Sequence, residues 1–409
     1  MSELTTDVIE SARSRAGFIE DLTSKLVAIP TENPPGNCYA ESAALLTATL
    51  SELGWAPRVI EAPGEHSGSR RSIILAGPED EQPVLTFHGH YDVVPADHAD
   101  QFAPRREGRR LIGRGTADMK GGVAAMIHAA AAVREVAPHA GNRIALVLVP
   151  DEETGGLLGS GYLQKRELLG RNSMGMLTPE PTSGVIWHAC RGAFTLQVTI
   201  HGRHAHVGHH YEGINAFEQM VRLANDLAEL KQSIETRETR FSLDSEPDPA
   251  LARKSILMMG GTVEGGTSFN AAPSRMSFTI ERRFNPEEDR DIERERLLSL
   301  LELHRSEGVD LTIEVLQDAP AAAAPVDDPL ARAVIESTET VLGERPRLEL
   351  CPGLLEIRWY AQQGVPAYAF GPGLLSVSHG PDEYVDLDAL SDYAAIYALT
   401  AFQRLTSVT

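Results

Sequence analysis

Histidine, aspartate and glutamate residues recur in this 409-residue chain at the ends of apolar runs. Neutral imidazoles and carboxylates are the ligand types that hold hydrolytic Zn²⁺, Co²⁺ or Mn²⁺. Five ligands and a spare glutamate are too many for one tetrahedral zinc ion. They suit two metal ions that share a bridging carboxylate, with one glutamate left to handle protons. The residues of this set and its surroundings are His90, Asp92, Asp118, Glu152, Glu153, Glu180 and His379.

The predicted secondary structure can bring these side chains together. Strands are expected at Val84–His88, Arg143–Val149 and Gly175–Thr178, directly before candidate ligands, and a helix is expected at Met119–Val136, directly after Asp118. Ligands bind at the carboxyl ends of the strands in an open α/β sheet. A lone histidine or aspartate in a loop is more often a cap or a surface residue. Several such placements at the same topological position favour a site.

Two acidic segments have more than one interpretation. Asp92 can accept the second N–H of His90, as outer partners of metal-binding histidines do, or it can cap the next turn. The adjacent Glu152 and Glu153 point in different directions, so one can bind metal while the other remains free as a general base. A solvated acidic turn is the alternative, and the preceding strand and following glycines argue against it. His88 shares a strand face with His90 and is predicted to pack rather than bind metal.

The pattern of predicted elements changes near residue 190. Strands and helices alternate before that point, which is typical of an α/β sheet. Two helices and several half-buried strands, beginning with Ala193–His201, then predict an α+β unit. The stretch 318–328 has linker composition, and the first pattern resumes after it. We therefore predict one catalytic domain, residues 1–189 and 318–409, interrupted by an inserted domain at residues 190–317.

Composition restricts the class of protein and its partners. The net charge of −21 disfavours nucleic-acid binding, because it repels phosphate backbones. The longest apolar stretch, Gly121–Val136, contains His128 and is too short for a membrane span. Cys38, Cys190 and Cys351 are widely spaced, and the N-terminus lacks a secretory pattern. These features predict a cytoplasmic protein without a nucleic-acid or membrane partner.

The chain resembles the dinuclear zinc amidohydrolases and exopeptidases that include acetylornithine deacetylase, succinyl-diaminopimelate desuccinylase, aminoacylase and glutamate carboxypeptidase. The resemblance runs nearly end to end, through PTENPPGN, HGHYDVVP, GRGTADMKGG, DEETGG, PEPT, GRHAHVGHHYEGINA, NAAPSRMSFTIERRFNP and SHGPDEYV. It implies a mixed-sheet zinc-exopeptidase-like catalytic domain with an inserted ferredoxin-like α+β dimerisation domain. It also implies a homodimer and two divalent metal ions per chain, with Zn²⁺ favoured over Co²⁺ or Mn²⁺.

The resemblance also implies a role for each residue of the candidate metal site. It divides the ligands between two metal ions that share a carboxylate: His90 and Glu180 on one side, Glu153 and His379 on the other, and Asp118 between them. Glu152 is then the general base and later the general acid. A cis peptide bond is implied between Asp118 and Met119.

In the inserted domain, the resemblance implies residues that bind substrate. His206 matches a histidine that reaches across the dimer to the substrate carbonyl oxygen. The pair His204 and His206 could instead mimic a metal site, but the absence of nearby carboxylates favours oxyanion stabilisation. Arg283 matches a residue that binds the substrate carboxylate, and Asn270 matches a second polar contact. Arg282 would point to the opposite face of its strand.

One segment departs from the family pattern. PGLLEIR stands where many members have a Gly-Gly-Thr-Ser-Asp-Ala-Arg type loop, so Leu354 and Leu355 replace hydroxyl-bearing residues and Glu356 replaces aspartate. This departure predicts a more apolar pocket on that side than in the desuccinylases.

The predicted function is hydrolysis of the amide bond of an N-acyl amino acid or a similar small carboxylate-bearing amide. A dipeptidase or carboxypeptidase of the same family is the alternative, since it needs the same chemistry. A non-catalytic binding protein is disfavoured because the ligand set and Glu152 are intact. The motifs GxSxG and HExxH do not occur, which argues against a serine hydrolase and a thermolysin-type protease.

Overall fold

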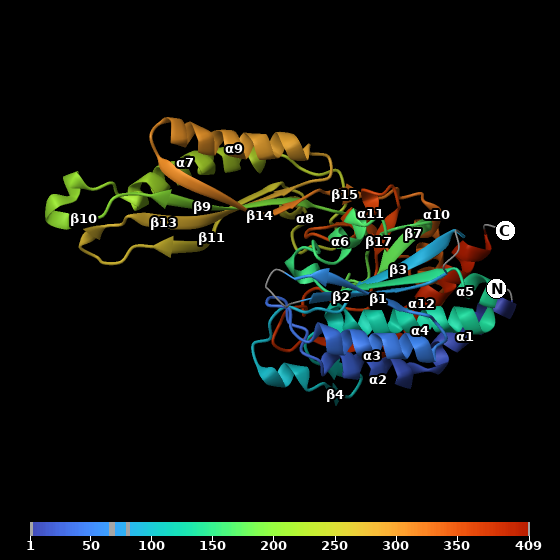
Figure 1. Ribbon diagram of the computed structural model, residues 1–409. Coiled ribbons are helices and arrows are strands. Elements are labelled where there is room, and N and C mark those ends of the chain that lie inside the picture. The colour runs from blue at the N-terminus through green and yellow to red at the C-terminus, as the bar shows by residue number, and fades with distance from the viewer. Residues whose placement is uncertain (1–2, 65–69, 79–81, 408–409) are drawn as a thin grey trace. The chain divides into compact units, whose positions relative to one another are not determined.

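The computed structural model describes residues 3–64, 70–78 and 82–407 (Figure 1). The chain divides into two compact units. The first unit contains Met1–His188, Ala324–Glu349 and Leu355–Thr409, and the second contains Ala189–Ala323 and Leu350–Leu354. Within the described residues, none of the helices is long and apolar enough to cross a membrane.

A mixed sheet forms the centre of the first unit. Its strands, in spatial order, are β1 (Arg58–Pro63), β2 (Arg70–Ala76), β6 (Ile144–Val149), β3 (Val84–His90), β7 (Ser173–Thr178), β17 (Ala367–Ala369), β8 (Ile186–Cys190) and β15 (Ala322–Ala323), and β16 (Leu348–Cys351) pairs with β8. The four strands from β6 to β17 run parallel, whereas β1, β2 and β8 pair antiparallel with their neighbours. The predicted mixed α/β sheet is therefore confirmed. The strands β1, β8, β15 and β16 were not predicted.

Helices cover both faces of this sheet. Figure 1 shows α3 (Tyr39–Glu52) and α4 (Gly121–Val136) on one face, and α6 (Ser160–Lys165) and α11 (Ile357–Ala361) on the other. The α4 helix also packs against α1 (Glu3–Ser14), α2 (Ala16–Val27) and α12 (Leu387–Thr406), and α10 (Pro329–Leu342) packs against α12. Twelve of the 16 residues of α4 are buried, which explains its high content of alanine, glycine and aliphatic residues. The core beneath the sheet is thus built around one nearly apolar helix.

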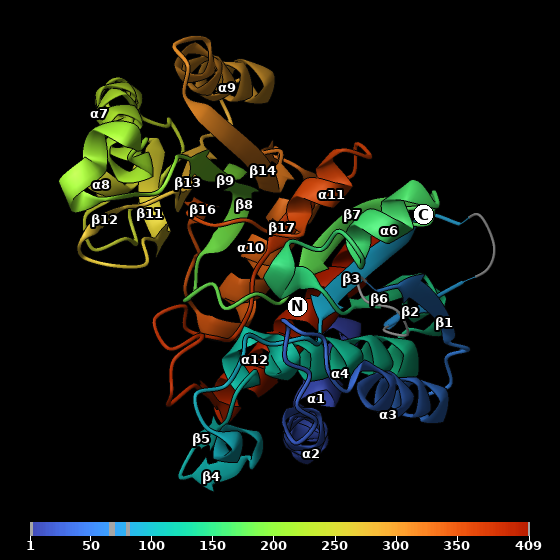
Figure 2. The same ribbon diagram turned by 60° about the vertical axis from the view of Figure 1, so that its left-hand side comes forward.

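The second unit has the ferredoxin-like order of strands. Its elements are β9 (Gly192–His201), α7 (Ala216–Ile234), β11 (Ile256–Gly265), β13 (Arg275–Phe284), α9 (Arg290–Ser306) and β14 (Asp310–Ala319). The antiparallel sheet has the order β11-β13-β9-β14, and Figure 2 shows both helices on one face of it. Phe194, Leu196, Val198 and Ile200 alternate along β9 and pack into the core with α7 and α9. The alternation that predicted this strand therefore marks its buried face.

The stretch predicted as a linker, residues 318–328, is partly strand. β14 continues to Ala319, and Ala322 and Ala323 form β15, opposite Cys190 and Ala189 of β8. The alanine-rich composition suggested a linker, but strand pairing uses the backbone and needs no particular side chain. The linker predicted from composition at residues 318–328 was therefore partly wrong.

A small sheet connects two distant parts of the first unit. β5 (Arg110–Ile112) pairs with β4 (Arg105–Glu107) on one side and with β18 (Tyr384–Asp386) on the other. The segment before the Asp118 turn therefore lies beside the segment after His379.

Candidate metal centre

The carboxyl ends of three neighbouring strands meet at the candidate site. β6, β3 and β7 are adjacent and parallel, so their carboxyl ends lie at the same edge of the sheet. His90 is the last residue of β3, and Glu180 follows β7 by two residues. Glu152 and Glu153 begin a short 3₁₀ turn, η3 (Glu152–Thr154), after β6. The topological prediction for these side chains is confirmed.

Asp118 takes part in two groups of candidate metal-binding side chains. His90, Asp118 and Glu180 form one group, and Asp118, Glu153 and His379 form the other, with the ligand atoms of each group within 4.8 Å of one another. Asp118 Oδ1 lies 3.2 Å from His90 Nε2, and Asp118 Oδ2 lies 3.3 Å from His379 Nε2. Each carboxylate oxygen of Asp118 therefore faces a different histidine.

The backbone before α4 presents Asp118 to both groups. Asp118 lies in the turn η2 (Thr116–Lys120) with φ −124° and ψ 96°, which is not helical geometry. The peptide bond between Asp118 and Met119 is cis. The predicted helix at Met119–Val136 accordingly begins later, at Gly121.

The surplus of buried negative charge fits cation binding. Glu153 Oε1 and Glu180 Oε1 are buried and have no hydrogen-bond partner among the described residues. Burial and the nearby Asp118 charge raise the pKa of both carboxyl groups. Hydrogen bonds to Asp118 and Glu153 raise the pKa of His379 to about 10. Buried carboxylates are costly unless they are paired or bind metal, so these groups fit divalent cations.

Asp92 fixes His90 and the glutamate turn together. His90 Nδ1 lies 3.4 Å from Asp92 Oδ1 and 3.1 Å from the Asp92 carbonyl oxygen, which leaves Nε2 facing Asp118. The Asp92 carboxylate also accepts hydrogen bonds from the backbone N–H groups of Glu152 and Glu153, at 3.2 and 3.1 Å. Asp92 therefore caps the η3 turn, and not the turn that follows Asp92 in the chain.

Glu152 lies beside the metal-binding groups without belonging to either. Its side chain is partly buried, and its neighbour Glu153 faces His379, with Oε2 3.4 Å from Nε2. Burial raises the pKa of Glu152 to about 8, and the charge of Glu153 acts in the same direction while that of His90 opposes it. The two adjacent glutamates thus differ in position: Glu153 belongs to a candidate metal-binding group, and Glu152 does not.

His88 packs rather than contributing to the metal-binding groups. Its Nδ1 is 3.0 Å from the Tyr360 hydroxyl, and its Nε2 is 3.1 Å from Glu356 Oε2. Glu356 also accepts a hydrogen bond from Ser160 Oγ. Only 3% of Leu355 is exposed, so this side chain contacts protein rather than lining an open apolar pocket as expected.

Sequence reasoning missed several residues that hold the site. Asn33, in the quoted motif PTENPPGN, donates to Asp92 Oδ2 and to Thr154 Oγ1, both at 2.9 Å. Arg358 donates to the carbonyl oxygen of Gly155 at 2.6 Å and so holds the end of the η3 turn. At Gly371, a Cβ atom would overlap the carbonyl oxygens of Pro179 and Glu180, so glycine allows the close approach beside Glu180. These residues lie in or near quoted motifs, but their partners are distant in sequence.

The other predicted residues lie in the second unit and in neither metal-binding group. His206 is exposed on β10 (Ala205–His206). Asn270 lies beside this strand, because its carbonyl oxygen accepts a hydrogen bond from the N–H group of Val207, the residue after His206, at 2.8 Å. Arg283, on β13, pairs with Glu281, and its Nη1 is buried without a hydrogen-bond partner among the described residues. Arg282 is buried and pairs with glutamates of its own unit.

Comparison with known proteins identifies the family. Residues 86–403 match peptidase family M20/M25/M40. The chain belongs to this family. It is 30% identical over 300 residues to a putative succinyl-diaminopimelate desuccinylase of Mycobacterium tuberculosis, covering 73% of this chain and 76% of that protein. It is 26% identical over 402 residues to a probable succinyl-diaminopimelate desuccinylase of Staphylococcus epidermidis, covering 92% and 95% of the two chains.

The fold agrees with this family. The structure of human carnosine dipeptidase 1 superposes with a TM-score of 0.77 at 16% identity, over 99% of both chains. The chain is thus a hydrolase of amide or peptide bonds, and its grouped His, Asp and Glu side chains could hold metal ions.

Proposed function

We propose that this M20 enzyme hydrolyses the amide bond of N-acyl amino acids or similar small carboxylate-bearing amides, using two Zn²⁺ ions per chain. The observation that carries the proposal is the pair of metal-binding groups that share Asp118, with Glu152 beside them in neither group. Two metal ions with a bridging carboxylate are a recurring arrangement for hydrolysis. The set of imidazole and carboxylate ligands supports Zn²⁺, and Co²⁺ or Mn²⁺ can use the same ligands.

The chain's own residues divide the chemical work. When bound, the metal ions polarise the scissile carbonyl group and make water more acidic. Glu152 accepts the proton of the attacking water and later donates it to the leaving nitrogen, which makes the amine a better leaving group. Asp92 orients this glutamate through the backbone of η3 and orients His90 through Nδ1.

Residues of the second unit would recognise the substrate. The unpartnered Nη1 of Arg283 supports binding of the substrate carboxylate, because a buried guanidinium N–H favours an acceptor. Asn270 would add a second polar contact. His206 has an exposed ring whose Nδ1 accepts a hydrogen bond from the Gly208 backbone at 3.2 Å, which leaves Nε2 for the substrate carbonyl oxygen.

The acyl group is tested by a substrate screen. We expect kcat/KM for N-acetyl and larger apolar N-acyl amino acids to exceed that for N-succinyl analogues by about tenfold or more. The reason is that Leu354, which is half-buried, replaces a hydroxyl-bearing residue, and hydrogen bonds to a charged group contribute about 1.5–3 kcal/mol. The screen should compare acetyl, formyl and succinyl derivatives of one amino acid with dipeptides, with Zn²⁺ or Co²⁺ added.

The same screen separates the alternatives. Faster turnover of the succinyl substrate than of every apolar acyl analogue would contradict the acyl preference and leave the amidohydrolase activity intact. Dipeptides turned over far better than all acyl amino acids would replace the deacylase proposal by the dipeptidase alternative.

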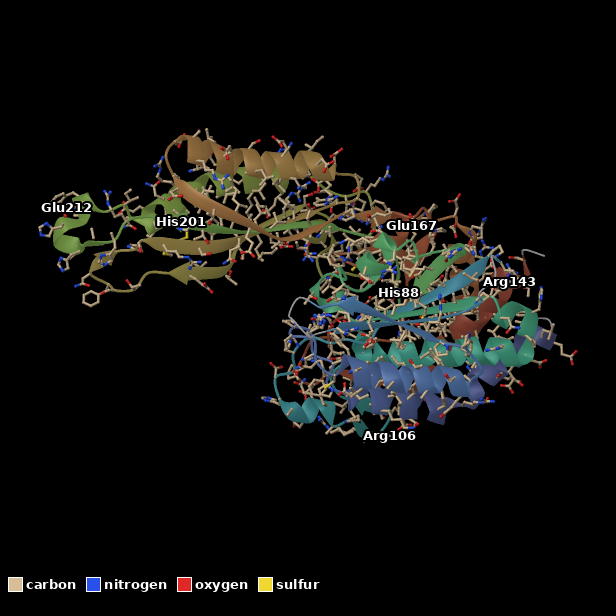
Figure 3. The ribbon with its side chains drawn as sticks, viewed as in Figure 1. His88, Arg106, Arg143, Glu167, His201 and Glu212 are labelled. Atoms are coloured by element: carbon tan, nitrogen blue, oxygen red, sulfur yellow. The ribbon has the colours of Figure 1, made fainter. Side chains whose placement is uncertain are left out.

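We also propose a homodimer formed through the second unit. This unit exposes large apolar side chains on and near η4 (Val207–Glu212) and α7: Val207, Tyr211, Ile214, Phe217 and Val221. Both edge strands of its sheet, β11 and β14, also carry exposed valine or methionine side chains. Exposed apolar patches and open strand edges favour association between copies. Figure 3 shows the segment around Glu212 at one end of this unit.

The dimer predicts that His206 acts in the partner's site. Mixing His206→Ala subunits with Glu152→Ala subunits, each nearly inactive alone, should restore activity. One site of the mixed dimer then combines an intact Glu152 with the other subunit's intact His206. A mixture of His206→Ala and Arg283→Ala proteins would reveal in the same way which subunit supplies Arg283. Persistent inactivity of verified mixed dimers would mean that His206 serves its own subunit or none.

We also propose that the protein is cytoplasmic. It rests on the three widely spaced cysteines, of which Cys190 and Cys351 are buried thiols and Cys38 is a partly buried one. A reducing compartment keeps such thiols intact.

A further inference from the structure

A buried arginine links the His379 loop to the segment before Asp118. Only 1% of Arg114 is exposed. Its Nη2 donates to the His379 carbonyl oxygen at 3.2 Å, and its Nη1 donates to the Gly380 carbonyl oxygen at 3.1 Å. The Arg114 guanidinium group therefore holds the backbone at His379, a candidate metal ligand.

A buried glutamate completes the link to Asp118. Glu383 is also 1% exposed, and its Oε1 accepts hydrogen bonds from the backbone N–H groups of Ala117 and Asp118, both at 3.0 Å. Its Oε2 lies 2.9 Å from Arg114 Nη1. The chain of contacts runs from the Asp118 backbone through Glu383 and Arg114 to the His379 backbone. We call these two residues the Arg114–Glu383 bracket.

The bracket lies where two distant segments are already paired. Tyr384 of β18 stands opposite Ile112 of β5, and the Gly113 N–H donates to the Glu383 carbonyl oxygen at 2.9 Å. Strand pairing therefore fixes the segments, and the bracket acts between their ends. His379 itself has φ 65°, a left-handed conformation that a residue other than glycine keeps only when its surroundings hold it.

A pair of buried charges is weak evidence for stability, because desolvation offsets much of the attraction. Here, the two groups also bond to backbone atoms beside candidate ligands: Arg114 donates to the carbonyl oxygens of His379 and Gly380, and Glu383 accepts from the N–H groups of Ala117 and Asp118. Arg114 Nη2 also donates to the Pro95 carbonyl oxygen at 3.4 Å. Outer partners that orient ligands are a recognised means of setting metal affinity. Positioning the candidate ligands would explain why a buried ion pair is present here, since apolar side chains of similar volume are often equally stable in such a place.

We propose that Arg114 and Glu383 are positioning residues that set the separation of Asp118 and His379, and with it the affinity for the metal ion held by Asp118, Glu153 and His379. The inference rests on the proposed two-metal function. Neither bracket residue belongs to a metal-binding group, so each acts through a ligand's backbone.

The test compares metal affinity with stability in the full-length enzyme. The variants are Arg114→Met, Glu383→Gln and the double variant, with dissociation constants for Zn²⁺ measured by competition with a chromophoric chelator. Each single change leaves a buried charge without its partner and should lower the Tm of the metal-free protein. The double variant should regain Tm, because neither charge remains. All three should bind the metal ion held by Asp118, Glu153 and His379 about 10–100-fold less tightly, so that one of the two measured dissociation constants rises by this factor.

The matched control is Arg143→Met. Arg143 is a buried arginine of the same unit that donates to the carbonyl oxygens of Pro83 and Leu405, at 3.0 and 2.9 Å. It precedes β6 and so lies at the opposite end of that strand from Glu152 (Figure 3). This change should lower Tm and leave both metal affinities as in the wild type.

The outcomes separate the bracket from the proposed function. A folded double variant that binds both metal ions with wild-type affinity would overturn the inference. If the double variant does not fold, Arg114→Lys decides, since lysine keeps the charge but has a single ammonium nitrogen in place of the planar fork of Nη1 and Nη2. Unchanged affinity in Arg114→Lys would overturn the inference, and a 10–100-fold loss would support it. A wild-type enzyme that binds fewer than two metal ions would instead contradict the proposed function.

Discussion

Complete removal of metal ions should abolish hydrolysis, and added Zn²⁺ should restore it. The buried carboxylates of Asp118, Glu153 and Glu180 meet at one site, and two of them have oxygens without a hydrogen-bond partner among the described residues. Without cations, no Lewis acid would polarise the scissile carbonyl or lower the pKa of the attacking water. Elemental analysis of the active enzyme should find about two metal ions per chain, as in other two-metal hydrolases.

The control for chelation is the same chelator already saturated with Zn²⁺, which should leave activity unchanged. The metal-free protein should also have a lower Tm, because the carboxylates then repel one another in a buried site. Full activity in a preparation shown by elemental analysis to be metal-free would contradict the metal-dependent mechanism.

The change Glu152→Ala should remove most turnover and leave the metal ions bound. Glu152 lies in neither metal-binding group, so only proton transfer is lost. Loss of a general acid–base group costs about 10²–10⁴-fold in rate. The measurements are kcat and the metal content of the purified variant.

Glu153→Ala is the matched comparison, because the two glutamates are neighbours in the same turn. Glu153 Oε2 faces His379 Nε2 at 3.4 Å, so this change should lower metal content as well as activity. Loss of both metal ions from Glu152→Ala, together with full metal content in Glu153→Ala, would exchange the two assignments.

Local patterns were sufficient to predict the strands that carry the site. The apolar runs before His90, Glu152 and Glu180 are long enough for buried parallel strands, and β3, β6 and β7 lie where these runs predicted. Sites in open α/β sheets lie at the carboxyl ends of the parallel strands, and this rule predicted that the candidate ligands meet at one edge of the sheet. The same local reasoning failed at residues 318–328, because backbone pairing with β8 leaves no mark in side-chain composition.

Substrate contacts were harder to predict from local sequence. Leu355 was expected beside an apolar pocket, but it is buried within the first unit, because an apolar residue in a loop can turn inward as readily as toward a ligand. Glu356 was noted as a departure, and its partners His88 and Ser160 emerge only in the structure. The sequence showed that this segment differs from the family pattern without showing what it contacts.

By itself, the sequence determined which residues are candidates for this chemistry: the types of the candidate ligands, their positions after apolar strands, and a glutamate beside one of them. Those properties are local, since each depends on a few neighbouring residues. Only the tertiary structure decided that Asp118 offers one oxygen to each histidine, and that Arg114 and Glu383, 269 residues apart, connect Asp118 with His379. Such contacts depend on how strands pair and loops close in space. Residue types do not reveal those distances. The sequence therefore predicted the candidate ligands of this centre, and the fold determined which atoms they face and which residues position them.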